Sequence, residues 1–100
     1  MMRITLGKNI YPDLNEEILE DLKRITKLYE IKISFLLDDG VEFTCPDTYS
    51  TDNRFGDIRI IINENTFVCY YENYNELTFI LVDGKKSKQI IVPILENKLL

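Results

Sequence analysis

Two short acid-x-lysine fragments are the parts of this sequence that come nearest to catalytic chemistry. Asp83-Gly84-Lys85 and Glu30-Ile31-Lys32 share a spacing that some metal-dependent nucleases use around a bound cation. Such a site also needs a carboxylate on a preceding strand, and none is identifiable, whereas Asp-Gly is first of all a hairpin turn. The chain has no histidine, so it lacks an imidazole base, Ser-His or Cys-His pairs and the common zinc sites. We therefore expect a protein that is not an enzyme.

Motifs for cofactors and metals are equally scarce. The four glycines are scattered and form no phosphate-binding loop. Asp47, Asp52 and Asp57 lack the alternating oxygens and the central glycine of a calcium loop. We expect neither a cofactor nor a bound metal.

Binding chemistry has better support in one tyrosine-rich turn. Tyr70, Tyr71 and Tyr74 lie within five residues and are flanked by acids and amides, including Glu72 and Glu76. Tyrosine supplies a large contact area at low entropic cost, so this mixture suits a protein interface. The plainer alternative is two tyrosines of a sheet followed by one in an ordinary surface turn.

A second candidate segment is the polar stretch over residues 46–56, the longest predicted loop. Loops of this length in a compact domain often carry function, although a plain surface crossover is an equal alternative. The predicted partner-binding residues in the two segments are Tyr49, Asp52, Tyr70, Glu72, Tyr74 and Glu76.

The charge is distributed unevenly. The net charge is −5, yet residues 33–83 hold ten acidic side chains against two arginines, and residues 84–100 are rich in lysine. Most of the acids fall at predicted turns. Such a field repels nucleic acid and anionic membranes and attracts basic proteins. The plainer alternative is that turns are polar in any acidic protein.

One amphipathic helix is predicted over residues 13–29. Asp13 is the expected N-cap, Glu16 completes a capping box, and Pro12 stands just before. Acids crowd the start and bases the end, as the helix dipole favours. The apolar stripe consists of Leu14, Ile18, Leu22, Ile25 and Tyr29.

The rest of the chain is predicted to form strands. Asp38-Asp39-Gly40 gives a tight hairpin, and the later strands form an antiparallel meander. The strands are expected at residues 3–6, 31–37, 41–45, 57–62, 67–71, 77–82 and 88–95. The order β-α-β-β-β-β-β-β over residues 1–100 predicts one α+β domain, with the helix packed on a curved, mainly antiparallel sheet.

Apolar residues fall on both faces of the late strands. Alternation directs Phe67, Cys69 and Tyr71 inward, together with Ile58, Ile60 and Ile62 of the preceding strand. The side chains left on the outer face are Ile61, Val68, Tyr70 and Ile80. One helix shields one face only. Each large apolar side chain left in water lacks the roughly 1.5–3 kcal/mol of stabilisation that burial would give. The early hairpin curling over this face, a second copy or another protein are three possible covers.

The two cysteines, Cys45 and Cys69, are expected as buried, reduced thiols. The sequence has no leader pattern and no apolar run of membrane-spanning length, so we expect the protein in the cytosol. The plentiful Ile, Asn, Lys and Tyr point to an AT-rich bacterial or phage genome.

Two classes of function follow from these features. The favoured hypothesis is a small acidic inhibitor, in the manner of phage anti-defence or toxin-immunity proteins, that blocks a basic, nucleic-acid-handling protein through an acidic, tyrosine-bearing surface. That comparison depends on size, charge and composition. The alternative is a self-associating structural or accessory subunit, a homodimer formed through the sheet face or through the edge strand at residues 88–95. Salt slows a charge-steered association and barely affects an apolar dimer.

Overall fold

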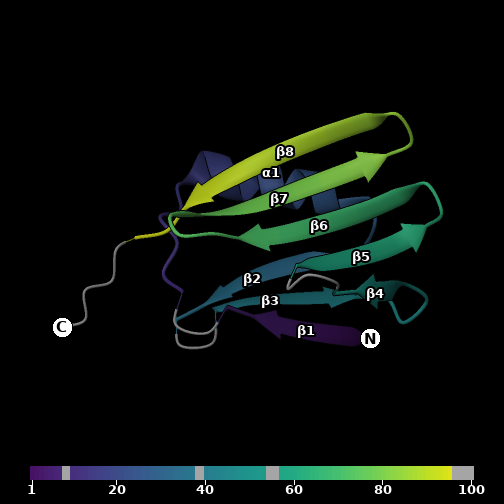
Figure 1. Cartoon of the computed structure of the whole chain (residues 1–100), viewed down its shortest axis with the longest axis horizontal. Helices are drawn as coiled ribbons and strands as arrows, with labels where there is room; N and C mark the ends of the chain where they lie inside the picture. The colour runs from purple at the N-terminus through teal and green to yellow at the C-terminus, as the bar shows by residue number, and fades with distance from the viewer. Residues whose placement is uncertain (8–9, 38–39, 54–56, 96–100) are drawn as a thin grey trace.

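Two antiparallel sheets and one helix make up the fold (Figure 1). The computed structural model describes residues 1–7, 10–37, 40–53 and 57–95. The elements are β1 (Met2–Leu6), α1 (Glu16–Lys27), β2 (Lys32–Leu36), β3 (Gly40–Cys45), β4 (Ser50–Asp52), β5 (Ile58–Asn63), β6 (Thr66–Glu72), β7 (Glu76–Asp83) and β8 (Lys86–Pro93). The strand orders are β1-β3-β2 and β4-β5-β6-β7-β8. The predicted α+β class is confirmed, with the strands divided between two sheets.

Helix α1 starts later than the sequence predicts. Its N-cap is Asn15, whose Oδ1 accepts a hydrogen bond from the Ile18 backbone N–H at 2.8 Å, and the predicted cap at Asp13 is wrong. The Asp13 N–H instead donates to the Pro93 carbonyl at 2.7 Å, next to an isolated bridge between Pro12 and Ile94. This contact with the end of β8 holds the segment before the helix in an extended conformation.

A tight turn ends α1 and leads directly into β2. The Glu30 N–H donates to the Lys27 carbonyl at 3.1 Å, and the Ile31 N–H donates to the Thr26 carbonyl at 3.2 Å. These are the two bonds of a Schellman motif, and Glu30 occupies its left-handed position at φ 58°. The predicted last residue of the helix, Tyr29, therefore belongs to the turn.

The predicted β2–β3 hairpin is confirmed by its register, which pairs Leu36 with Gly40. Its turn residues 38 and 39 lie outside the described residues. Gly40 has φ 82°, and a Cβ there would lie 2.0 Å from the Gly7 carbonyl oxygen, so the position requires glycine. The predicted loop at 46–56 is partly wrong, because its residues 50–52 form β4 and pair with β5.

The core lies between the two sheets. The Phe43 ring of the early hairpin packs edge-on against the Tyr70 ring at 5.7 Å and lies 6.1 Å from the Phe79 ring. Helix α1 lies behind β7 and β8 (Figure 1) and adds the buried Leu22 to this core. Within the described residues, the early hairpin and α1 thus pack on the same inner face of the late strands. The outer face, for which the sequence predicts a cover, is left to its own side chains.

The faces of β6 are the reverse of the prediction. Val68 and Tyr70 are 2% and 4% exposed and point into the core, whereas Phe67 and Tyr71 are half-buried on the outer face. The sequence Phe-Val-Cys-Tyr-Tyr has no polar alternation that would fix its direction. The register of β5 with β6 also shifts between Ile61 and Asn63, so the direction of the side chains in β5 does not fix their direction in β6.

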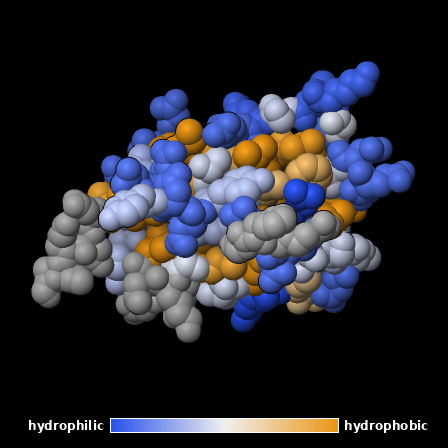
Figure 2. Space-filling view, viewed as in Figure 1, coloured by the Kyte–Doolittle hydropathy of each residue, from blue (hydrophilic) through white to orange (hydrophobic). Residues whose placement is uncertain are grey.

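The outer face of the five-stranded sheet is shielded in part by its own side chains. The Arg59 guanidinium lies 4.8 Å from the centroid of the Phe67 ring, and Cys69, opposite Arg59 in the register, is only 3% exposed. Ile61 and Ile80 are half-buried here, so their predicted direction is right. Figure 2 shows the resulting surface as apolar patches broken by polar groups. Both cysteines are free and buried, as predicted, with Cys69 on the outer instead of the inner face.

Candidate functional site

The turn between β6 and β7 presents an exposed aromatic side chain on a fixed backbone. Tyr74 is 94% exposed, the largest value among the exposed large hydrophobic residues that the structure describes. The Asn73 Oδ1 accepts hydrogen bonds from the N–H groups of Asn75 and Glu76, both at 3.0 Å. The Asn73 N–H donates to the Glu76 carbonyl at 3.1 Å. The backbone that carries Tyr74 is therefore held by three bonds, while its ring is free for contact.

A second chain segment lies against this turn and adds a carboxylate. The Ile94 N–H donates to the Asn75 carbonyl at 2.8 Å, and Glu76 is the register partner of Pro93. The Pro93 carbonyl in turn accepts the bond from Asp13. Asp13 and Glu76 therefore lie on either side of the last residue of β8. We call the group formed by Asp13, Glu72, Tyr74 and Glu76 the acidic tip.

The carboxylates of the acidic tip have no cationic partner in the part of the chain that the structure describes. Within the described ranges, no salt bridge involves Asp13, Glu72 or Glu76. Asp13 and Glu72 are exposed and Glu76 is half-buried. An incoming cationic group thus meets three charges that need not first be released from internal partners.

Tyr70 does not belong to this surface. Its side chain is 4% exposed and packs against Phe43 and Phe79, with 5.5 Å between the Tyr70 and Phe79 ring centroids. Burial, assisted by the nearby Glu72 charge, raises the pKa of the Tyr70 hydroxyl well above its usual value. Among the described residues, that hydroxyl has no hydrogen-bond partner. Tyr70 is a core residue and cannot contact a partner directly.

Tyr49 and Asp52 lie apart from the acidic tip. The Tyr49 hydroxyl donates to the Tyr29 carbonyl at 2.6 Å, and the Tyr29 hydroxyl donates to Asp83 Oδ2 at 2.6 Å. Asp83 and Glu76 are the two opposite ends of β7. Tyr49, which is linked to Asp83 through Tyr29, therefore lies far from Tyr74, which is next to the Glu76 end. Asp52 closes β4 opposite Arg59, on the outer face of the five-stranded sheet. Of the six predicted contact residues, the structure brings together three, Glu72, Tyr74 and Glu76.

Asp13 is the residue of the acidic tip that sequence reasoning missed. The sequence around Asp13 predicts a helix cap, because Asp followed by Glu at the third position matches a capping box. The available signal was Pro12, which disfavours helix immediately before itself and suits an extended approach to β8.

The acid-x-lysine fragments occupy structural positions. Asp83 accepts hydrogen bonds from Tyr29 and from the Thr66 hydroxyl, the latter at 3.1 Å, and these bonds lower the pKa of its carboxyl. Glu30 forms the Schellman turn described above. In the described part of the chain, no three His, Cys, Asp or Glu side chains cluster closely enough to hold a metal ion.

Comparison with known proteins gives no match, since no family model fits the sequence and no curated protein or solved structure is significantly similar to the chain. Among the described residues, no helix has both the length and the apolar character needed to cross a membrane. The functional interpretation therefore depends on the geometry of the molecule itself.

Proposed function

We propose that this chain is a non-enzymatic binding protein that docks its acidic tip on a basic surface of a nucleic-acid-handling protein and thereby inhibits it. The observation that carries the proposal is Tyr74, 94% exposed on a turn held by three hydrogen bonds. The carboxylates beside it form no salt bridge within the described residues. An exposed tyrosine on a preformed turn loses little conformational freedom on binding.

The charge of the tip favours a basic partner. Carboxylates at the rim of an interface mainly accelerate association, and their effect declines as salt screens them. Nuclease and other nucleic-acid-binding surfaces carry the lysines and arginines that such carboxylates attract. The same field disfavours direct binding of nucleic acid or of an anionic membrane. A cytosolic location agrees with a partner of this class.

Charge reversal at the tip tests the proposal. The variant Glu72→Lys/Glu76→Lys is compared with Glu64→Lys/Glu20→Lys, which makes the same change in net charge at exposed positions elsewhere. Tagged forms of each protein are used for affinity capture from the extract of expressing cells, and the captured partner is purified for kinetic measurement. We expect the tip variant to lose the partner, the control variant to retain it, and salt to lower the association rate. A tip variant that retains the same partner at unchanged affinity would contradict the proposal.

Homodimer formation is the second candidate, and one observation favours it. β8 is the terminal strand of its sheet, and Ile91 on it is 45% exposed. The same strand also carries Lys86 and Lys88, and lysines on an edge strand oppose pairing with an identical edge. Sedimentation over a range of salt concentrations distinguishes the two candidates, because an apolar dimer persists at high salt and a charge-steered complex weakens.

A further inference from the structure

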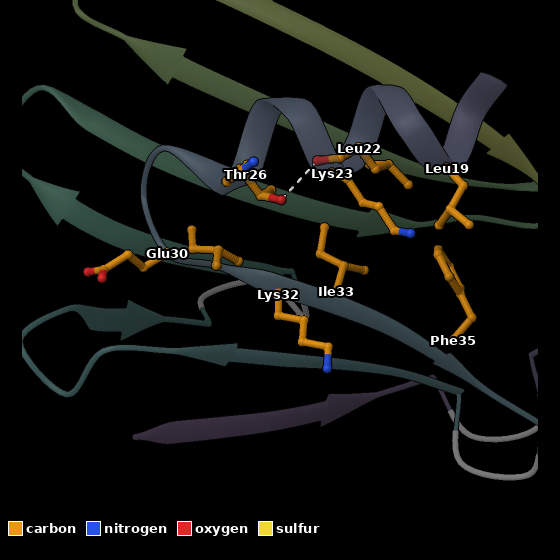
Figure 3. Close-up of a pocket in the computed structure, with 10 residues that line it drawn as sticks. Leu19, Leu22, Lys23, Thr26, Glu30, Lys32, Ile33 and Phe35 are labelled. Atoms are coloured by element: carbon orange, nitrogen blue, oxygen red, sulfur yellow. Dashed lines mark hydrogen bonds between the residues drawn. The ribbon is translucent and has the colours of Figure 1, made fainter. Parts of the chain in front are cut away.

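A groove of about 440 Å3 separates α1 from β2 (Figure 3). Its size is in the range of ordinary ligand sites. Its apolar lining consists of Leu19, Leu22, Ile31, Ile33 and Phe35. Leu22 and Ile31 are 2% and 4% exposed, whereas Leu19, Ile33 and Phe35 are only half-buried. The groove is thus a place where the side chains of the core remain open to solvent.

The turn between the two elements shapes the groove. The bond from the Ile31 N–H to the Thr26 carbonyl holds α1 and β2 together at one end. Toward Leu19 and Phe35 the helix and the strand diverge, and these two side chains point toward each other across the gap (Figure 3). The groove is therefore closed at the turn, where α1 and β2 are hydrogen-bonded.

One wall of the groove is the free edge of a strand. In the order β1-β3-β2, β3 occupies one side of β2, and no described strand pairs with its other side. In an antiparallel sheet, alternate residues of an edge strand direct both N–H and C=O away from the sheet. β2 therefore presents unpaired backbone donors and acceptors toward the groove, and this is the arrangement that accepts an added strand.

The rim of the groove is cationic. Lys23 and Lys27 on α1 and Lys32 on β2 are exposed, and no salt bridge within the described ranges involves any of them. The Lys23 side chain extends over the gap, and the carboxylate of Glu30, the single acidic lining residue, points away from it (Figure 3). Three lysines against one glutamate thus surround an apolar floor in a chain whose net charge is −5.

We propose that this groove binds an extended acidic segment of a partner protein, which adds to the free edge of β2 as a further strand. Side chains of a strand alternate between two faces. With apolar residues at every second position, one face of the segment covers Leu19, Ile33 and Phe35. The intervening acidic residues then face outward toward the lysine rim. Backbone pairing supplies affinity, and the alternation of apolar and acidic residues supplies specificity.

Charge argues against a second copy of this chain as the occupant. Among the terminal strands of the two sheets, β8 carries Lys86 and Lys88, β1 carries Arg3 and β2 itself carries Lys32. Each of these edges would bring further cations to the lysine rim, and like charges across an interface disfavour association. The fourth terminal strand, β4, has only three residues, which is shorter than β2.

A synthetic probe tests the groove on the intact chain. The probe is a capped peptide of about six residues in which Val alternates with Glu, a length typical of one strand. Binding is followed by amide chemical shifts, and the changes are expected in β2 and along α1 from Leu19 to Thr26. The variant Lys23→Glu/Lys27→Glu is expected to bind the peptide about tenfold more weakly. Its control, Lys85→Glu/Lys86→Glu, makes the same change in net charge at exposed residues outside the groove and is expected to bind as the wild type does.

N-methylation of the peptide separates strand addition from simple apolar contact. Two peptides are methylated at alternate amides in opposite phase, so that one loses the N–H groups that face β2 and the other keeps them. Strand addition predicts a loss of affinity of about tenfold or more for one phase only.

Equal affinity of both phases, binding of a Val-Lys peptide as tight as that of Val-Glu, or shift changes confined to other strands would overturn the proposal. A groove that takes dodecanoate and not the peptide would also overturn it, in favour of a small amphipathic anion. Self-association that is abolished by Lys23→Glu/Lys27→Glu would identify a second copy as the occupant and overturn it as well.

Discussion

Replacement of Tyr70 by Phe tests whether this residue belongs to the core or to an interaction surface. The ring packs against Phe43 and Phe79, and the hydroxyl is buried without a hydrogen-bond partner among the described residues. A Cβ built on Gly7 would lie 3.1 Å from this oxygen, which shows how closely the chain surrounds it. Tyr70→Phe removes the polar atom and keeps the ring.

The magnitude follows from two opposing effects. A buried hydroxyl without a partner costs about 1–3 kcal/mol, which the substitution recovers. The void left by one oxygen atom, roughly 10–15 Å3, costs about 0.3 kcal/mol at about 24 cal/mol per Å3. We expect the variant to be more stable than the wild type by about 1–2 kcal/mol. In a domain of this size each kcal/mol raises Tm by about 4–8 °C.

Urea denaturation followed by far-UV circular dichroism measures this difference at neutral and at alkaline pH. Burial raises the pKa of the folded Tyr70 hydroxyl, while the unfolded hydroxyl ionises near its usual pKa of about 10. The unfolded chain then binds fewer protons than the folded chain above that pH, so the stability of the wild type falls as pH rises. Tyr70→Phe abolishes this contribution, and its advantage should grow above about pH 10. A variant that is less stable than the wild type at neutral pH would refute the assignment of an unpartnered core hydroxyl.

Three further predictions concern the turn after α1, the Tyr29 contact and the thiols. Glu30→Gly should stabilise the fold by about 0.5–1 kcal/mol in urea denaturation, because φ 58° is unfavourable for a residue with a Cβ; Glu30→Ala keeps that cost and should gain nothing. Tyr29→Phe should raise the pKa of the Asp83 carboxyl toward its usual value in an NMR titration. The Tyr29–Asp83 pair stabilises the folded state above about pH 4, and this stabilisation is lost as pH falls. Tyr29→Phe should reduce that contribution, and an unchanged Asp83 titration would refute the contact. Cys45 and Cys69, 1% and 3% exposed, should react with a thiol reagent only on unfolding, and prompt labelling of either in the native protein would contradict their burial.

Local chemistry predicted the elements of this fold that depend on neighbouring residues. The turn signal before Gly40 predicted the first hairpin, and the alternation in residues 41–45 gave its inward face, where Val41 and Phe43 have no exposed surface. The apolar stripe likewise predicted the side of α1 that faces the core, since Leu22 on it is buried.

Long-range contacts decided the features that were predicted wrongly. Asp13 and Asn15 are both good caps, and the bond between the Asp13 N–H and Pro93, about eighty residues away along the chain, selects Asn15. Residues 67–71 suit either face of a sheet, and only packing against Phe43 places Tyr70 inside. The short strand β4 is too polar to be recognised without its partner β5.

The burial of Val68 and Tyr70 changes the basis of the functional hypothesis. The sequence suggested that an uncovered apolar sheet face needs a partner, but Val68 and Tyr70 lie in the core beneath the early hairpin. On the outer face, where Ile61 and Ile80 are half-buried, Arg59 packs on the Phe67 ring. A binding role therefore depends on the acidic tip, where the Tyr74 side chain is 94% exposed and packs against none of the described core residues.

The acidic tip and the lysine-rimmed groove have opposite charge and share no residue, so each can be tested while the other stays intact. A salt titration alone cannot tell them apart, because screening weakens contacts to both. Charge reversal does, since Glu72→Lys/Glu76→Lys leaves the groove unchanged and Lys23→Glu/Lys27→Glu leaves the tip unchanged. A partner that loses affinity for both variants would have to span both surfaces and present a basic patch together with an acidic strand. A partner that responds to only one variant would assign its binding to that surface.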